Sequence, residues 1–78
     1  MAHSDRPLVE AFGRVVRDRR HDAGISQMEL ALAAGLASSF VSQIENGLRG
    51  VSLETIAGLA KALDTSAEDL IGAAERSR

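Results

Sequence analysis

Residues 27–47, with the sequence QMELALAAGLASSFVSQIENG, constrain the fold more than any other part of this chain, because two short helical segments flank one glycine. Ser26 and Glu29 have the spacing of a capping box, which predicts that the first of these helices begins at residue 27. Gly35 can adopt the left-handed conformation that ends a helix. A second helix is expected over about residues 37–46. The segment therefore predicts two helices joined by a tight turn.

The second of these helices has an apolar inner face and a polar outer face. Val41 and Ile44 are spaced to point inward, together with the methylene groups of Glu45. The outward positions carry hydroxyls and an amide: Ser38, Ser39, Ser42 and Gln43. A polar helix face behind a tight turn is suited to reading base edges in the major groove of DNA.

The remainder of the chain also carries helix signals, and no stretch alternates with the period of a β-strand. Pro7 suits a first helical turn and Gly24 suits a helix end, so one helix is expected between them. Ser52 is the expected N-cap of a fourth helix that reaches about Asp64. The expected fold class is therefore all-α, a compact bundle of five helices.

The fifth helix is expected to be short. It begins at Ser66, with Asp69 in the capping-box position, and Gly72 can end it. Residues 73–78 are polar and are expected to fray. The whole chain, residues 1–78, is then a single domain with a core at about residues 7–72 and polar tails at both ends.

Composition excludes several classes of protein. The chain has no cysteine, so it has neither disulfides nor thiolate metal sites. His3 and His21 have no neighbouring set of metal ligands, and neither a catalytic pattern nor a glycine-rich phosphate loop is present. We expect neither an enzyme nor a metal, cofactor or obligatory small-molecule ligand. Residues 1–7 are polar and no apolar run approaches a membrane span, so a cytoplasmic protein without a membrane partner is expected.

Charge is distributed unevenly along the chain. Nine basic and eleven acidic side chains give a net charge of −2 at pH 7, whereas a basic surface is expected of a nucleic-acid binder. Residues 1–24 contain five arginines and four acids, and residues 52–78 contain three basic residues and five acids. Binding is compatible with this balance if the acidic end faces away from DNA. A single copy should nevertheless bind weakly, which makes dimerisation necessary.

Over residues 12–70 the chain resembles the DNA-binding domain of lambda-type repressors, the Cro/C1 or XRE-type helix-turn-helix family. The residues that carry the resemblance are Arg20, Ser26-Gln27, Leu30-Ala31, Gly35, the run VSQIENG at 41–47, Arg49 and Ser52-Leu53. The segment IENGLRGVSLETIAGLAKAL is also similar to the controller proteins of restriction-modification systems. The resemblance implies a transcriptional regulator that binds double-stranded DNA as a homodimer on a palindromic operator.

The resemblance also implies roles for individual residues. Gln27, Asn46 and Arg49 take positions that contact the phosphate backbone. The base-facing positions are those of Ser38, Ser39, Ser42 and Gln43. Gln43 is the best candidate for base readout, because its amide can pair with N6 and N7 of adenine. Serine hydroxyls discriminate bases poorly, and Ser38 has an alternative role as a cap or phosphate contact.

Simpler roles stay open for several of these side chains. Gln27 and Arg49 are alternatively solvated surface residues. Phe40 either touches a sugar or thymine methyl group or fills a gap against the first helix. Arg14 and Arg17 are candidates for flanking phosphate contacts, but their acidic neighbours favour a solvated helix face.

Arg20 and Glu45 match a family pair that forms a salt bridge between the first and third helices. A bidentate link of this kind would fix the recognition helix, and loss of one partner would leave an unpaired, partly buried charge. Neither residue is expected to read bases.

The last two helices are the candidates for a dimer interface. Two recognition helices related by a two-fold axis engage half-sites roughly 34 Å apart. The expected interface residues are Leu63, Ala67, Leu70 and Ile71, because a short terminal helix does not need this much apolar surface for its own burial. The alternative is that they close the core of the single chain.

A second function is compatible with the same shape. The domain would then bind protein, as an antitoxin or as a subunit of a larger regulatory complex, and the low net basicity favours this reading. Polar residues at the DNA-facing positions favour the regulator.

Overall fold

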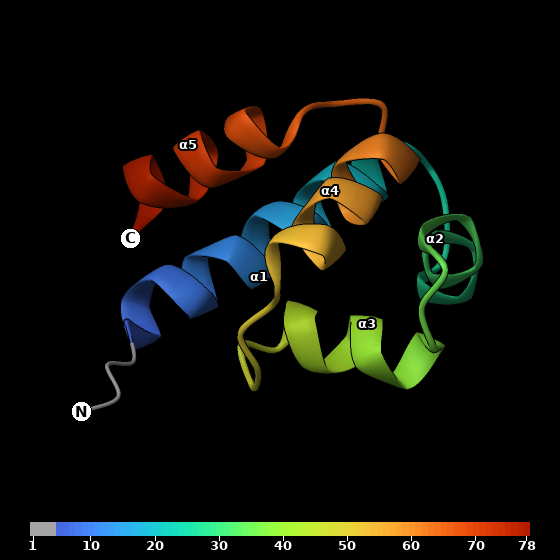
Figure 1. Cartoon of the computed structure of the whole chain (residues 1–78), viewed down its shortest axis with the longest axis horizontal. Helices are drawn as coiled ribbons and strands as arrows, with labels where there is room; N and C mark the ends of the chain where they lie inside the picture. Colours follow the sequence, from blue (N-terminus) through green and yellow to red (C-terminus); the bar gives the residue numbers. More distant parts are fainter. Residues whose placement is uncertain (1–4) are drawn as a thin grey trace.

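The computed structural model describes residues 5–78, which form five α-helices with no strand among them (Figure 1). The helices are α1 (Arg6–Asp22), α2 (Gln27–Ala34), α3 (Ser38–Glu45), α4 (Leu53–Ala62) and α5 (Ala67–Ser77). The expected all-α fold class is confirmed. His3 and most of the expected N-terminal tail lie outside the described residues.

The long helix α1 lies between the two outer helices of the bundle. It packs against both α3 and α5, while α4 packs against α2 and α5. In Figure 1, α3 and α5 lie on opposite sides of the molecule, with α1 and α4 between them. The start of α1 and the end of α5 lie at the same end, where the Arg78 guanidinium pairs with the Asp5 carboxylate. The acidic α5 therefore lies away from α3.

Local signals position α2 and α3 as the sequence predicts. The backbone N–H of Glu29 donates to the Ser26 hydroxyl at 3.0 Å, and the backbone N–H of Ser26 donates to the Glu29 carboxylate at 2.8 Å. Gly35, with φ of 72°, is in the left-handed region that favours glycine, and it ends α2. The capping box and the glycine thus place the start of α3 close to the end of α2.

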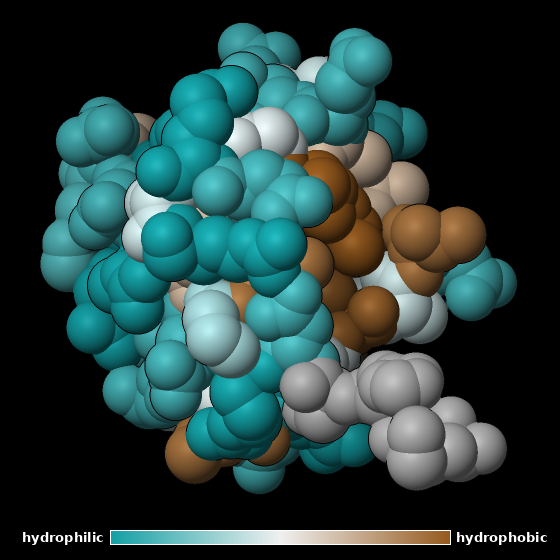
Figure 2. Space-filling model, turned by 90° about the vertical axis from the view of Figure 1, so that its left-hand side faces the viewer, coloured by the Kyte–Doolittle hydropathy of each residue, from teal (hydrophilic) through white to brown (hydrophobic). Residues whose placement is uncertain are grey.

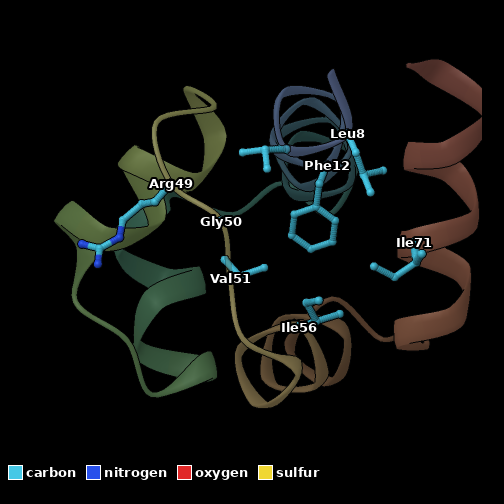
Figure 3. A pocket seen from close by; sticks show the side chains of 8 residues that line it. Leu8, Phe12, Arg49, Gly50, Val51, Ile56 and Ile71 are labelled. Carbon is cyan, nitrogen blue, oxygen red and sulfur yellow. The ribbon is translucent and has the colours of Figure 1, made fainter. Parts of the chain in front are cut away.

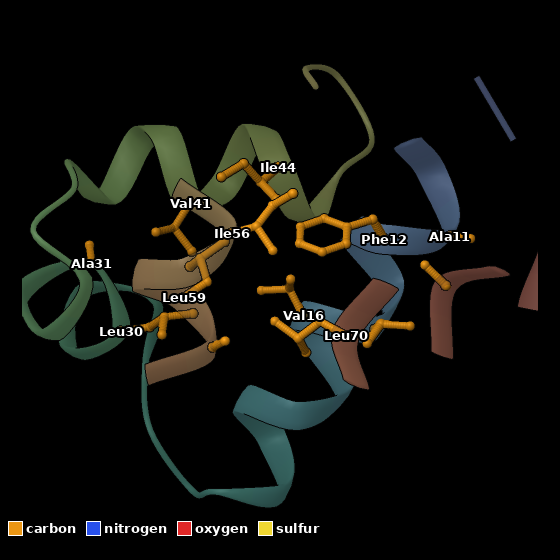
Figure 4. Packing of buried hydrophobic residues seen from close by; sticks show 13 residues of the cluster. Ala11, Phe12, Val16, Leu30, Ala31, Val41, Ile44, Ile56, Leu59 and Leu70 are labelled. Carbon is orange, nitrogen blue, oxygen red and sulfur yellow. The ribbon is translucent and has the colours of Figure 1, made fainter. Parts of the chain in front are cut away.

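One apolar core joins all five helices (Figure 4). Its largest fully buried side chains are Val16 from α1, Leu30 from α2, Val41 and Ile44 from α3, Leu59 from α4 and Leu70 from α5. Because every helix contributes to the same cluster, the position of α3 depends on the packing of the whole bundle.

The end of α5 differs from the sequence prediction. The helix does not end at Gly72 but continues to Ser77, and Ala74 is fully buried. Near its end, Arg14 Nη2 donates to the carbonyl of Ser77 at 3.2 Å. Packing against α1 thus outweighs the helix propensity lost at one glycine, which is about 1 kcal/mol. For this reason three predictions are wrong: that the helix ends at Gly72, that residues 73–78 fray, and that the core ends at residue 72.

The start of α5 is capped, but not by a complete capping box. The backbone N–H of Asp69 donates to the Ser66 hydroxyl at 3.0 Å. The Asp69 carboxylate turns away from Ser66 and accepts from Arg19 Nη1 at 2.6 Å and from the Thr65 hydroxyl at 2.8 Å. The side chain in the capping-box position therefore ties α5 to α1.

α1 and α3 approach each other closely at Gly13. A Cβ at this position would overlap the carbonyl oxygen of Ile44 and lie 3.1 Å from that of Glu45. Gly13, Arg17 and Arg20 share one face of α1, since they are spaced by four and three residues. The absence of a side chain at Gly13 therefore lets both arginines reach the end of α3.

Replacement of Gly13 by alanine is expected to lower the free energy of unfolding by about 2 kcal/mol or more, because the new methyl group would push α1 away from the α3 backbone. The measurement is urea denaturation followed by circular dichroism. Gly72→Ala is the matched control, since its added Cβ meets only the flexible end of Arg76. That control should keep or increase stability, and equal stability of the two variants would contradict the steric argument.

Candidate nucleic-acid interface

α3 presents the polar face that the sequence predicts. Ser38, Ser39 and Gln43 are exposed, whereas Val41 and Ile44 are buried. Ser42 is half-buried, and its carbonyl accepts from Asn46 Nδ2 at 2.9 Å. Three of the four base-facing candidates are thus open to a ligand from outside.

The carboxylate of Glu45 connects three helices at the end of α3. Glu45 is only 2% exposed. Arg20 of α1 donates to it from Nε at 2.7 Å and from Nη2 at 3.0 Å. Gln27, at the start of α2, donates from Nε2 to Glu45 Oε1 at 3.0 Å. The expected ion pair between Arg20 and Glu45 is therefore present and bidentate, and it includes an additional partner from α2.

The charges in this cluster stabilise one another. Burial alone would raise the pKa of the Glu45 carboxyl, but hydrogen bonds from Arg20 and Gln27 and the nearby positive charges hold it below its ordinary value. The hydrogen bond to Glu45 raises the pKa of Arg20 in turn. The cluster is therefore ionised at neutral pH, and no buried side-chain polar atom among the described residues lacks a hydrogen-bond partner.

Arg17 belongs to the same cluster, which the sequence analysis did not predict. Its Nη2 donates to Asn46 Oδ1 at 3.0 Å and to the Glu45 carbonyl at 3.4 Å, and its Nε lies 3.6 Å from Glu45 Oε1. The signal was present, because Arg17 lies three residues before Arg20 on the same face of α1. Arg17 remains 40% exposed at its side chain and carries positive charge to the end of α3.

Two of the expected phosphate contacts are engaged inside the chain. Gln27 donates to Glu45, and Asn46 both accepts from Arg17 and donates to the carbonyl of Ser42. Asn46 Nδ2 also donates to the Ser42 hydroxyl at 3.4 Å, so both of its N–H groups have partners inside the chain. Gln27 Nε2 donates only to Glu45, so it keeps one N–H for a ligand. Their phosphate roles stay predictions.

Arg49 follows α3 and folds back onto it. Its Nη1 donates to Gln43 Oε1 at 3.2 Å, and its guanidinium carbon lies 4.9 Å from the centre of the Phe40 ring. The side chain of Phe40 is half-buried and packs against the core. Phe40 therefore packs against the core and supports Arg49, while its predicted contact with the first helix stays a prediction.

An apolar hollow of about 180 Å³ lies on the other side of the loop that carries Arg49. Its lining residues are Leu8, Val9, Phe12, Arg49, Gly50, Val51, Ile56 and Ile71. In Figure 3 the Arg49 side chain points away from the hollow. The hollow thus offers apolar surface without a charged group to orient a small molecule.

Figure 2 shows an apolar patch on the end of the molecule where α1 starts and α5 ends.

The four residues expected at a dimer interface differ in exposure. Leu63, Ala67 and Ile71 are half-buried and retain some surface. Leu70 is fully buried in the core of the single chain. Its expected place in an interface is therefore wrong, because a side chain that closes the core has no surface to offer a partner.

Other features of the described residues add no second site. His21 is exposed, with Nε2 3.2 Å from Arg20 Nη2. Within residues 5–78, no three side chains of histidine, cysteine, aspartate or glutamate are grouped to hold a metal ion. None of the five helices has the length and apolar character that crossing a membrane requires.

Replacement of Glu45 by glutamine is expected to lower the free energy of unfolding by about 3 kcal/mol at pH 7, because two arginines lose their buried partner. The pKa of Glu45 is lowered by folding, so its charge stabilises the fold above its ordinary pKa near 4.5 and this contribution is lost as the pH falls further. The difference between wild type and variant should therefore shrink below about pH 4.5. Urea denaturation at a series of pH values from 3 to 7 measures this difference in the free energy of unfolding.

The control is Glu54→Gln, which removes an exposed carboxylate from the first turn of α4. It should change stability by less than about 0.5 kcal/mol at every pH. A Glu45→Gln effect that is equally large at pH 3 and pH 7 would contradict the assigned role of the carboxylate charge.

Comparison with known sequences identifies the domain. Residues 11–71 match the family described as "Helix-turn-helix domain". The chain is 40% identical over 58 residues to the uncharacterized HTH-type transcriptional regulator Rv0474 of Mycobacterium tuberculosis, which covers 74% of this chain and 41% of that protein. It is 39% identical over 61 residues to the control protein C.BamHI of Bacillus amyloliquefaciens, covering 77% of this chain and 75% of that one. The chain thus spans about two fifths of the length of the mycobacterial regulator.

Solved structures with the same fold are also regulators. The clp gene regulator ClgR of Corynebacterium glutamicum has a TM-score of 0.85 and 36% identity over 90% of each chain. The restriction-modification controller protein C.AhdI of Aeromonas hydrophila has a TM-score of 0.76 and 44% identity, covering 81% of this chain and 94% of that one. The chain therefore belongs to the helix-turn-helix domain family, whose members among its relatives are named as transcriptional regulators and controller proteins.

Proposed function

We propose that this protein regulates transcription as a homodimer that binds a palindromic operator, with α3 of each copy in the major groove. The observation that carries the proposal is the exposed polar face of α3 on a helix whose other face is anchored by buried side chains. An exposed helix held rigidly in this way can present side chains to base edges without a cost for ordering them on binding.

The distribution of charge supports this orientation. The guanidinium group of Arg17 reaches from α1 to the end of α3, and Arg49 lies in the loop that follows α3. Both can approach phosphates of a duplex bound by α3. The helix α5, which carries Glu68, Asp69 and Glu75, lies on the opposite side of the bundle from α3 (Figure 1). A net charge of −2 is therefore compatible with DNA binding by the α3 side, although the attraction of one copy is weak.

The names of similar proteins support a role in regulation and suggest two kinds of regulated gene. ClgR is described as a clp gene regulator, and C.AhdI as a restriction-modification controller protein. We propose the same general activity for this chain, located in the cytoplasm with the DNA that it binds. The regulated genes and the direction of regulation depend on the position of the operator.

The proposed dimer uses apolar surface at α4 and α5. Leu63, Ala67 and Ile71 keep part of their surface exposed, and Ile71 also lines the apolar hollow. Covering these side chains by a second copy would bury apolar surface in both copies. The pairing also supplies the second recognition helix that a weakly attracted single copy lacks.

Selection from a random duplex library is the direct test of the function. The purified protein is expected to recover a two-fold symmetric motif whose half-sites are about one helical turn, roughly 34 Å, apart. Binding to that motif should weaken linearly in log–log form as salt increases, because phosphate contacts release counterions. Recovery of no motif, with weak retention of all sequences, would instead favour the protein-interaction module.

The proposed interface is tested by Ile71→Glu. The charge should weaken self-association about tenfold or more, because an unpaired carboxylate would be buried between the two copies. Sedimentation equilibrium measures the dimer dissociation constant, and circular dichroism checks that the fold is intact. Leu32→Glu is the control, because Leu32 is 84% exposed on α2. Unchanged association of the Ile71 variant would exclude this surface.

A further inference from the structure

The side chain of Gln43 does not stand alone on the outer face of α3. Arg49 Nη1 donates to Gln43 Oε1 at 3.2 Å, and both side chains are exposed. The guanidinium also lies 4.9 Å from the centre of the Phe40 ring. Since Phe40 is half-buried and packs against the core, it provides a fixed support beneath the arginine. Three residues thus form one connected surface group.

This contact determines which way the Gln43 amide faces. A guanidinium group has five N–H donors and no acceptor. The atom of Gln43 that faces Arg49 must therefore be the carbonyl oxygen, and the amide nitrogen must point the other way. Gln43 then offers its two N–H donors to a ligand, while a positive charge lies beside its only acceptor.

We propose that Arg49 sets the base preference of Gln43, so that the pair reads guanine and not adenine; the inference rests on the proposed insertion of α3 into the major groove. Adenine presents the N7 acceptor and the N6 donor, and a glutamine matches it by accepting from N6 with its carbonyl while its amide donates to N7. Here the guanidinium N–H groups lie beside that carbonyl, so the adenine amino group would meet donors.

Guanine fits the pair better. Its major-groove edge presents two acceptors, N7 and O6. The Gln43 amide nitrogen can donate to one of them, and a free N–H of Arg49 can donate to the other. Among the residues that the structure describes, no carboxylate lies within ion-pair distance of Arg49, so its charge is available to the base. Arg49 is then a specificity-determining residue in addition to any phosphate contact.

The test compares base preferences rather than total affinity. Starting from the motif that the wild-type protein selects, binding is measured on duplexes that carry each of the four base pairs at every half-site position. Gln43→Ala identifies the position that Gln43 reads, since preference should disappear there. At this position the wild type should prefer guanine to adenine by about fivefold or more. Arg49→Ala should shift the preference toward adenine by at least that factor, because the Gln43 carbonyl becomes free.

Two further variants separate this role from a general effect of charge. Phe40→Leu removes the aromatic support and should cause a smaller shift in the same direction. Lys61→Ala removes one exposed positive charge from α4 and should leave all base preferences unchanged. Thermal unfolding of each variant checks that the fold is intact.

The outcomes are distinguishable. A uniform loss of affinity in Arg49→Ala, with base preference unchanged at the Gln43 position, would overturn the inference and leave Arg49 as a phosphate contact in a functioning regulator. A wild-type preference for adenine at that position would also overturn it. Failure of the wild-type protein to select any motif would refute the proposed function itself, and the inference with it.

Discussion

The orientation of α3 depends on one buried carboxylate. Glu45 is the last residue of α3, and it accepts hydrogen bonds from Arg20 of α1 and Gln27 of α2. A buried charge that loses its partner costs several kcal/mol, so α3 cannot shift away from either helix without a large penalty. The close approach at Gly13 makes the contact geometrically feasible, because any side chain there would separate α1 from α3. The interaction is therefore better understood as a device that fixes orientation than as a large net gain in stability.

Whether the sequence predicts a structural feature depends on how far apart in the chain the interacting residues are. The capping box at Ser26 and the left-handed Gly35 are local, and both were predicted at the correct residues. The pair of Arg20 and Glu45 is distant in sequence and was predicted only through the family resemblance. The end of α5 could not be predicted, because the signal at Gly72 is local, whereas the packing that overrides it comes from the other end of the chain. Leu70 was wrongly predicted at the dimer interface for the same reason. The sequence pattern of a short apolar helix is the same whether its side chains close the core of one chain or contact a second chain.

The candidate site shows a similar division. Helical spacing predicted the exposure of Ser38, Ser39 and Gln43 but not the half-buried Ser42, because the buried and exposed faces follow the period of the helix. It was insufficient for side-chain partners. Arg17 was a candidate phosphate contact for which a solvated helix face was favoured, yet it links α1 to Asn46 at the end of α3. Residues proposed to contact DNA thus also organise the surface, since Gln27 and Asn46 are both engaged inside the chain, and only Gln27 retains a free amide N–H.

Because α3 carries mostly serines on its outer face, the proposed base selectivity depends on the surroundings of Gln43. A hydroxyl both donates and accepts, so Ser38 and Ser39 can follow the hydrogen-bonding pattern of more than one base. In the proposed complex, discrimination by direct contact therefore depends mainly on the Gln43 amide, and an isolated amide can rotate to exchange its donor and acceptor sides. A neighbouring guanidinium removes that freedom, because only one amide orientation satisfies it. The aromatic support from Phe40 restrains the guanidinium in turn. A helix with few long polar side chains can in this way obtain selectivity from a residue that lies outside the helix.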